Sequence, residues 1–211
     1  MAESAPSPSD GTPAVALGEA LTVDVGRLMS DRLGLSQSDL ITRPTGRAVR
    51  EAIEACTAGA SGGTVALVEL SGVRVMDFSC ADEVVAGLLL RSRDSSRSVL
   101  RYFIFRGCEH LHGHAVAEVL SRRGLAAACA FGGRPFHLVG EVSDGQRAAW
   151  LALEERRRIA LGEATTLLGP GGRARLVEIC EMRLAHMNSG GQVRALSRIG
   201  RGGGDGAARI A

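Results

Sequence analysis

The segment TVALVEL, residues 64–70, most constrains the fold, because it is almost wholly apolar and rich in β-branched residues. A run of this length and composition is typical of a central strand that is covered on both faces. A second such run, VLRYFIF at 99–105, follows a helical pattern over 81–93. We therefore expect strands to alternate with helices around a largely parallel or mixed sheet, which is an α/β fold.

The chain of 211 residues divides into four stretches by composition. Residues 1–15 are rich in Pro, Ser and Ala, which predicts a disordered tail, and the Gly-rich residues 201–211 predict a flexible end. The alternating strands and helices occupy residues 16–142. Residues 143–200 contain three short helical patterns and then a hairpin that turns at SGG, 189–191. This is the order of a winged helix-turn-helix, so we expect a small α+β module there.

Two local signals predict where helices begin. Thr45 follows a proline and precedes a helical pattern that stops at Gly59, so it is the expected N-cap. Ser143 and Gln146 have the spacing of a capping box at the start of the C-terminal module. Trp150, the only tryptophan, lies on the helix that follows and is expected to anchor its core.

Composition excludes several classes of function. All 25 basic residues are arginine, so the chain has no Schiff-base lysine and no P-loop ending in Gly-Lys-Ser/Thr. Its five cysteines are scattered without a C-x-x-C pair, which favours reduced thiols over disulfides or zinc. No apolar run approaches the roughly 18 residues of a membrane-spanning helix, and the start lacks a signal peptide. We expect a cytoplasmic protein.

Charge is divided unevenly along the chain. Residues 1–144 carry 14 arginines against 17 acidic residues, a net charge of −3. Residues 145–211 carry 11 arginines against 6 acidic residues, a net charge of +5. An acidic N-terminal part and a basic C-terminal part predict two modules with different partners.

The junction between strand and helix in residues 68–91 gathers small polar and acidic side chains. Ser79 precedes the expected helix and can cap it, while Asp82 and Glu83 would offset the positive end of the helix dipole. The same residues could instead form a surface for a partner. A phosphate on Ser79 would gain from the helix start, but Asp77 and the two later acids would repel it. Capping, docking and phosphorylation therefore remain three interpretations of this junction.

The motif at this junction resembles that of STAS-type domains, which are found in bacterial anti-sigma-factor antagonists. It is most similar to the STAS-like branch, whose motif runs Asp-x-Ser-x-Ala-Asp-Glu after a hydrophobic-Ser-Gly-Val turn. TRPTGRAVREAIE, residues 42–54, is similar to the helix that precedes the central strand in that branch. The resemblance covers roughly residues 17–140 and implies a mixed sheet flanked by helices.

The resemblance also implies a role without catalysis. Antagonists of this type switch between protein partners such as a histidine-kinase-like ATPase or an anti-sigma factor. Their phosphorylated serine follows the aspartate of the motif, where this chain has Phe78, so Ser79 is the nearest hydroxyl. The expected partner-docking residues are Asp77, Ser79, Asp82 and Glu83, with Ser79 as the possible site of phosphorylation.

The segment CEHLHGH, residues 108–114, is a candidate metal site because it offers thiol and imidazole ligands, Cys108, His110, His112 and His114. Flanking glycines make it a loop that enters a helix, and no second ligand cluster appears. A cysteine nucleophile at Cys80 or Cys108 would lack an orienting third group. We therefore expect no metal, no cofactor and no enzymatic activity.

The alternative function is that of a DNA-binding transcriptional regulator. The predicted helix over residues 173–187 would be the recognition helix of the winged-helix-like module. Basic side chains on or near this helix and the hairpin would contact phosphates: Arg173, Arg175, Arg183, Arg194 and Arg198. Many winged helices bind proteins instead, so both kinds of partner remain open. No membrane partner is expected.

Overall fold

A six-stranded sheet forms the centre of the computed structural model, which describes residues 20–35, 39–60, 63–94, 101–108, 110–199 and 208–210. Its strand order is β11-β1-β3-β5-β6-β7, and every neighbouring pair is parallel except β6 and β7. The strands are β1 (Ala20–Asp24), β3 (Thr64–Glu69), β5 (Arg101–Cys108), β6 (Ala126–Phe131), β7 (His137–Gly140) and β11 (Ala208–Ile210). The expected mixed α/β sheet is confirmed.

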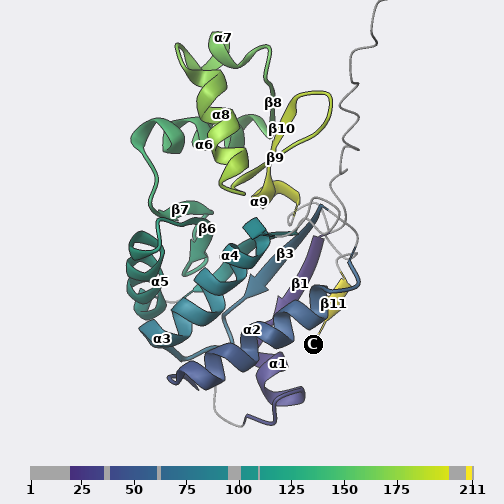
Figure 1. Cartoon of the computed structure of the whole chain (residues 1–211), viewed down its shortest axis with the longest axis vertical. Coiled ribbons are helices and arrows are strands. Elements are labelled where there is room, and N and C mark those ends of the chain that lie inside the picture. Colours follow the sequence, from purple (N-terminus) through teal and green to yellow (C-terminus); the bar gives the residue numbers. More distant parts are fainter. Residues whose placement is uncertain are drawn as a thin grey trace, which may run out of the picture.

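Helices cover one face of this sheet (Figure 1). They are α1 (Val25–Asp31), α2 (Arg43–Thr57), α5 (His110–Arg122) and one continuous helix made of α3 (Phe78–Ala81), a π-helical turn η1 (Asp82–Ala86) and α4 (Gly87–Asp94). Ala66 and Val68 of β3 face these helices. A short parallel pair, β2 (Asp39–Leu40) and β4 (Val75–Met76), leads into α2 and α3.

Residues 143–199, the C-terminal unit, cover the other face of the sheet. The unit consists of α6 (Asp144–Arg156), β8 (Arg158–Ala160), α7 (Ala164–Leu168), α8 (Gly172–Glu181), β9 (Ala185–Met187), β10 (Gln192–Ala195) and α9 (Leu196–Ile199). Its three strands form an antiparallel sheet in the order β8-β10-β9. Val65 and Leu67 of β3 share a buried cluster with Trp150 and Leu153 of α6. TVALVEL is therefore covered on both faces, as its composition predicted.

Several local predictions in the C-terminal unit are confirmed. Ser143 and Gln146 form a complete capping box, with the Ser143 hydroxyl accepting from the Gln146 N–H and the Gln146 carboxamide accepting from the Ser143 N–H. Trp150 is 1% exposed, and its Nε1 donates to the Leu184 carbonyl oxygen at 3.3 Å. The hairpin turns between β9 and β10, where the SGG sequence indicated.

Three predicted boundaries are wrong. Thr42, not Thr45, caps α2, because its hydroxyl accepts from the Thr45 N–H. Asp77 caps the helix that Ser79 was expected to cap, so that helix begins at Phe78. The expected helix over 173–187 ends at 181, because Arg183 adopts a left-handed conformation with φ of 63° and the chain continues as β9.

Both predicted tails fall wholly or partly outside the described residues. Residues 1–15 are among those not described, as are 201–207. Residues 208–210 form β11 and pair in parallel with β1, where the sequence indicated only a flexible end. Within the described ranges, no helix has the length and apolar character that crossing a membrane requires.

Candidate docking site at the ends of β2 and β4

The first turn after β4 is built around the carboxylate of Asp77. Its Oδ1 accepts from the Cys80 N–H at 2.8 Å, which is the N-cap bond of α3. The Ser79 hydroxyl donates to the same oxygen at 2.9 Å. Burial raises the pKa of Asp77, but the bonds from Cys80 and Ser79 outweigh it, so the pKa lies below its ordinary value. Ser79 therefore supports the cap as a donor and is not the cap itself.

Asp82 is held by arginines from two other elements. Arg123, just after α5, donates from Nε to Oδ1 at 2.8 Å and from Nη2 to Oδ2 at 2.7 Å. Arg43 of α2 donates to Oδ2 at 3.2 Å. The hydrogen bonds from Arg123 lower the pKa of Asp82, and although burial opposes this, the charges of both arginines add to the decrease.

Glu83 has the same kind of surroundings. Arg43 donates to its Oε1 at 2.9 Å, Arg47 lies 3.7 Å from the same oxygen, and the buried Arg50 lies 3.6 Å from Oε2. Only 13% of the Glu83 side chain and 14% of the Asp82 side chain is exposed. The carboxylates of these two acids bind arginines of the same chain, and their docking role stays a prediction.

Two of the exposed side chains at this junction are large and apolar. Phe78, the first residue of α3, is 47% exposed, and Ile41, just after β2, is 53% exposed. The two lie on adjacent segments, because Leu40 accepts from the Asp77 N–H and the Thr42 carbonyl accepts from the Cys80 thiol. The Phe78 ring also meets the ring of His114 edge-on, with centroids 5.7 Å apart. The sequence motif drew attention to the acids and missed this apolar pair.

The histidine segment supports the structure around this junction. His112 is fully buried, and its Nε2 lies 3.2 Å from the Arg74 carbonyl oxygen. His114 is exposed and contacts Phe78, while the side chains of Cys108 and His110 fall outside the described part. Among the described residues, no three His, Cys, Asp or Glu side chains are grouped to hold a metal ion.

Cys80 has the properties of a structural thiol. It is fully buried, and its Sγ donates to the Thr42 carbonyl oxygen at 3.1 Å. Burial and the nearby charge of Asp77 raise its pKa to about 12. Because a thiolate is the reactive form, this cysteine is unsuited to nucleophilic catalysis at neutral pH.

The five arginines predicted to contact DNA have different surroundings. Arg173 and Arg194 are exposed on α8 and β10, whereas Arg175 is half-buried. Arg183 lies beyond the end of α8, and its Nε is buried. Arg198 lies in α9, and its side chain is outside the described part. Of the four arginines whose side chains are described, only Arg173 and Arg194 are exposed.

Comparisons of the chain with models of protein families, with curated proteins and with solved structures find no match. The structure defines the class of the chain as mixed α/β, with helices on one face of a sheet and a small α+β unit on the other.

Proposed function

We propose that this chain is a non-enzymatic regulatory protein that docks a protein partner through Phe78 and Ile41. The observation that carries the proposal is the exposure of these two large apolar side chains on adjacent segments. Exposed aromatic and aliphatic side chains that lie together are typical of the centre of a protein interface. Arg43 and Arg47 are exposed beside them and would form a polar rim suited to an acidic partner surface.

The rigidity of this junction supports the proposal. Phe78 follows Asp77, which caps the helix, and the next turn is held to α2 and α5 through Asp82 and Glu83. An anchor that is already fixed loses little conformational freedom when a partner binds. Figure 1 shows α3 at the end of the molecule opposite the C-terminal unit, so a partner would approach without meeting that unit.

The resemblance to STAS-like domains supports a role in partner switching. The partner would be a histidine-kinase-like ATPase or an anti-sigma factor, and Phe78 stands where antagonists carry their phosphorylated serine. Phosphorylation of Ser79 would place a phosphate against the Asp77 carboxylate, to which its hydroxyl now donates. An apolar contact at Phe78 is therefore the favoured mode of recognition.

The test compares proteins retained from a lysate of the source cells by the immobilised full chain and by two variants. Phe78→Ser should lose the specific partner, because an apolar anchor at the centre of an interface typically contributes about 2 kcal/mol or more. Leu167→Ser is the matched control, since Leu167 is 41% exposed on α7. The purified partner is then titrated against all three proteins. Equal retention by the wild type and Phe78→Ser contradicts the proposal.

A second candidate function is DNA binding by the C-terminal unit. It is favoured by the order of helices and hairpin, by the exposed Arg173 and Arg194, and by the net charge of +5 over residues 145–211. Binding to duplex DNA should weaken steeply with salt, and the double variant Arg173→Gln/Arg194→Gln should reduce the salt slope by about two. Arg27→Gln, an exposed arginine on α1, is the control. No retention of DNA at low salt rejects this function.

A further inference from the structure

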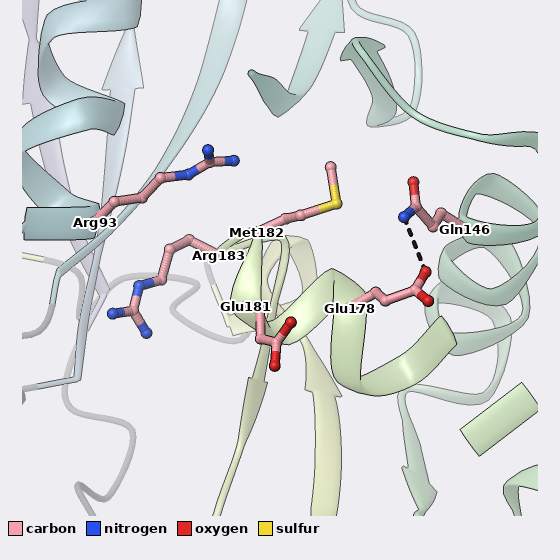
Figure 2. Close-up of a pocket in the computed structure, with 6 residues that line it drawn as sticks. All are labelled: Arg93, Gln146, Glu178, Glu181, Met182 and Arg183. Carbon is pink, nitrogen blue, oxygen red and sulfur yellow. Dashed lines mark hydrogen bonds between the residues drawn. The ribbon is translucent and has the colours of Figure 1, made fainter. Parts of the chain in front are cut away.

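A pocket of about 420 Å³ lies where the C-terminal unit meets the end of α4, away from Phe78 (Figure 2). Its lining residues are Arg93, Gln146, Glu178, Glu181, Met182 and Arg183. A volume of this size lies within the range of small-molecule sites, roughly 300–1,000 Å³. The pocket has no role in the docking function proposed above, so its occupant is a separate question.

One side of the pocket carries positive charge without a counter-ion. Arg93 of α4 and Arg183 both line it. Burial lowers the pKa of the Arg93 guanidinium, and the charge of Arg183 lowers it further. No carboxylate in the described part of the chain forms an ion pair with either of them. Two partly buried guanidinium groups that repel each other favour an anionic group between them.

Arg183 lies just beyond the end of α8 and carries one unsatisfied donor. Its left-handed backbone, with φ of 63°, closes the C-terminus of α8, where the Leu184 N–H donates to the Ile179 carbonyl oxygen at 2.9 Å. Its Nε is buried and has no hydrogen-bond acceptor among the described residues. A buried donor without an acceptor calls for an explanation in a native structure, and a bound acceptor would supply one.

The other side of the pocket is rich in acceptors. Gln146 donates from Nε2 to Oε2 of Glu178 at 2.9 Å. Glu181, which is exposed and also lines the pocket, lies between this pair and the arginines in Figure 2. Figure 2 shows the two arginines on one side, Gln146 and Glu178 on the opposite side, and Met182 between them. The pocket therefore changes from positive to negative across its width, with an apolar side chain in the middle.

We propose that this pocket binds a small zwitterionic ligand of the amino-acid type. Its carboxylate would lie against Arg93 and Arg183, its ammonium group would face Glu178 and Glu181, and its side chain would contact Met182. A purely anionic ligand such as phosphate fits less well, because the two glutamates would repel it. A purely cationic ligand would meet the same difficulty at the arginines.

The test titrates the full chain with each of the twenty common L-amino acids and, separately, with inorganic phosphate. Trp150 is a built-in reporter, because it is the only tryptophan and donates to the carbonyl of Leu184, the residue after Arg183. At least one amino acid should change its fluorescence with saturation and raise the midpoint of thermal unfolding. The N-acetyl and the amide derivatives of that amino acid should each bind about tenfold more weakly or worse, because each lacks one charge.

Arg93→Gln should weaken binding of the same amino acid by about tenfold or more. Arg91→Gln is the matched control, because Arg91 lies on the same helix but pairs with Glu54, and it should leave binding unchanged. Three results would overturn the proposal: no amino acid binds, phosphate binds and amino acids do not, or Arg93→Gln binds as the wild type does. Each result is independent of the docking test at Phe78.

Discussion

Arg123 binds both carboxylate oxygens of Asp82, at 2.8 and 2.7 Å, although the two residues are 41 positions apart in the sequence. The pair joins the end of α5 to the helix that begins at Phe78. Two-point contact of this kind is among the stronger polar interactions in proteins and fixes geometry as well as charge. Asp82 is therefore part of the framework that holds Phe78 in place, and its substitution tests the fold before it tests recognition.

Asp82→Asn should lower the free energy of unfolding by about 1–3 kcal/mol, because it leaves Arg123 and Arg43 without their shared carboxylate. Urea unfolding at neutral pH measures the loss. Glu118→Gln is the control, since Glu118 pairs with Arg122 on the exposed face of α5 and contributes at most about 0.5 kcal/mol. Equal losses in the two variants would show that the Asp82 contact is no stronger than a surface pair.

The contribution of Asp82 should also depend on pH. Its pKa is lowered in the folded state, chiefly by the hydrogen bonds from Arg123, so the ionised form stabilises the fold. This contribution is fully present above the unfolded pKa of about 4 and is lost as pH falls through the lower folded pKa. The difference in unfolding free energy between the wild type and Asp82→Asn should therefore shrink as pH is lowered from 5 to 3. A difference that stays constant over this range argues against the ion pair as its source.

Features that depend on local patterns could be predicted from the sequence. TVALVEL is buried on both faces because an apolar run without alternation has no polar face to expose. The Ser143–Gln146 capping box and the glycine-rich hairpin turn were also predicted correctly, because each motif is complete within a few residues. These features account for the alternating α/β order and for most elements of the C-terminal unit.

The arrangement of the candidate site could not be predicted from local patterns, because it depends on contacts between residues that are distant in the sequence. Arg43 and Arg123 meet Asp82 only after α2 and α5 have packed beside the same helix. Local ambiguity explains the wrong start of α2, because Thr42 and Thr45 both suit an N-cap. The strand β8 was not among the predicted elements, since it has only three residues. The exposure of Phe78 follows from tertiary packing, which its apolar character alone would not have indicated.

Gly46→Ala should destabilise the protein, because α2 passes very close to α3 at this point. A Cβ at Gly46 would lie 3.0 Å from Cys80 Cα and 3.2 Å from Glu83 Cβ. Overpacking of this kind typically costs about 1–3 kcal/mol, which exceeds the gain of about 0.5–1 kcal/mol from alanine within a helix. The midpoint of thermal unfolding should fall. Gly59→Ala is the matched control, with no atom within 4 Å, and should leave stability unchanged or slightly increased.

The sheet and the C-terminal unit should unfold together. Val65, Leu67 and Ile104 of the sheet share one buried cluster with Trp150, so separating the two parts would expose apolar surface on both. Urea curves followed by Trp150 fluorescence, which reports on the unit, and by far-UV circular dichroism, which reports on the whole chain, should coincide. Two separated transitions would instead mean that the unit has an independent core.

Acidification should weaken the contact between the sheet and the C-terminal unit. The Tyr102 hydroxyl of β5 lies 2.9 Å from Nδ1 of His186 in β9, and both side chains are 3% exposed. Burial lowers the pKa of His186, and the charge of Arg194 lowers it further, so the folded state disfavours the protonated ring.

The neutral ring therefore stabilises the fold above the unfolded pKa of about 6.5, and this contribution is lost as pH falls through the lower folded pKa. Between pH 7.5 and 5.5 the wild type should lose more unfolding free energy than His186→Gln, which keeps a hydrogen-bonding side chain that does not titrate. Equal losses would assign the acid sensitivity to other groups. A larger loss in the wild type would identify His186 as the group that couples pH to the packing of the C-terminal unit, because its ring contacts Tyr102 of the central sheet.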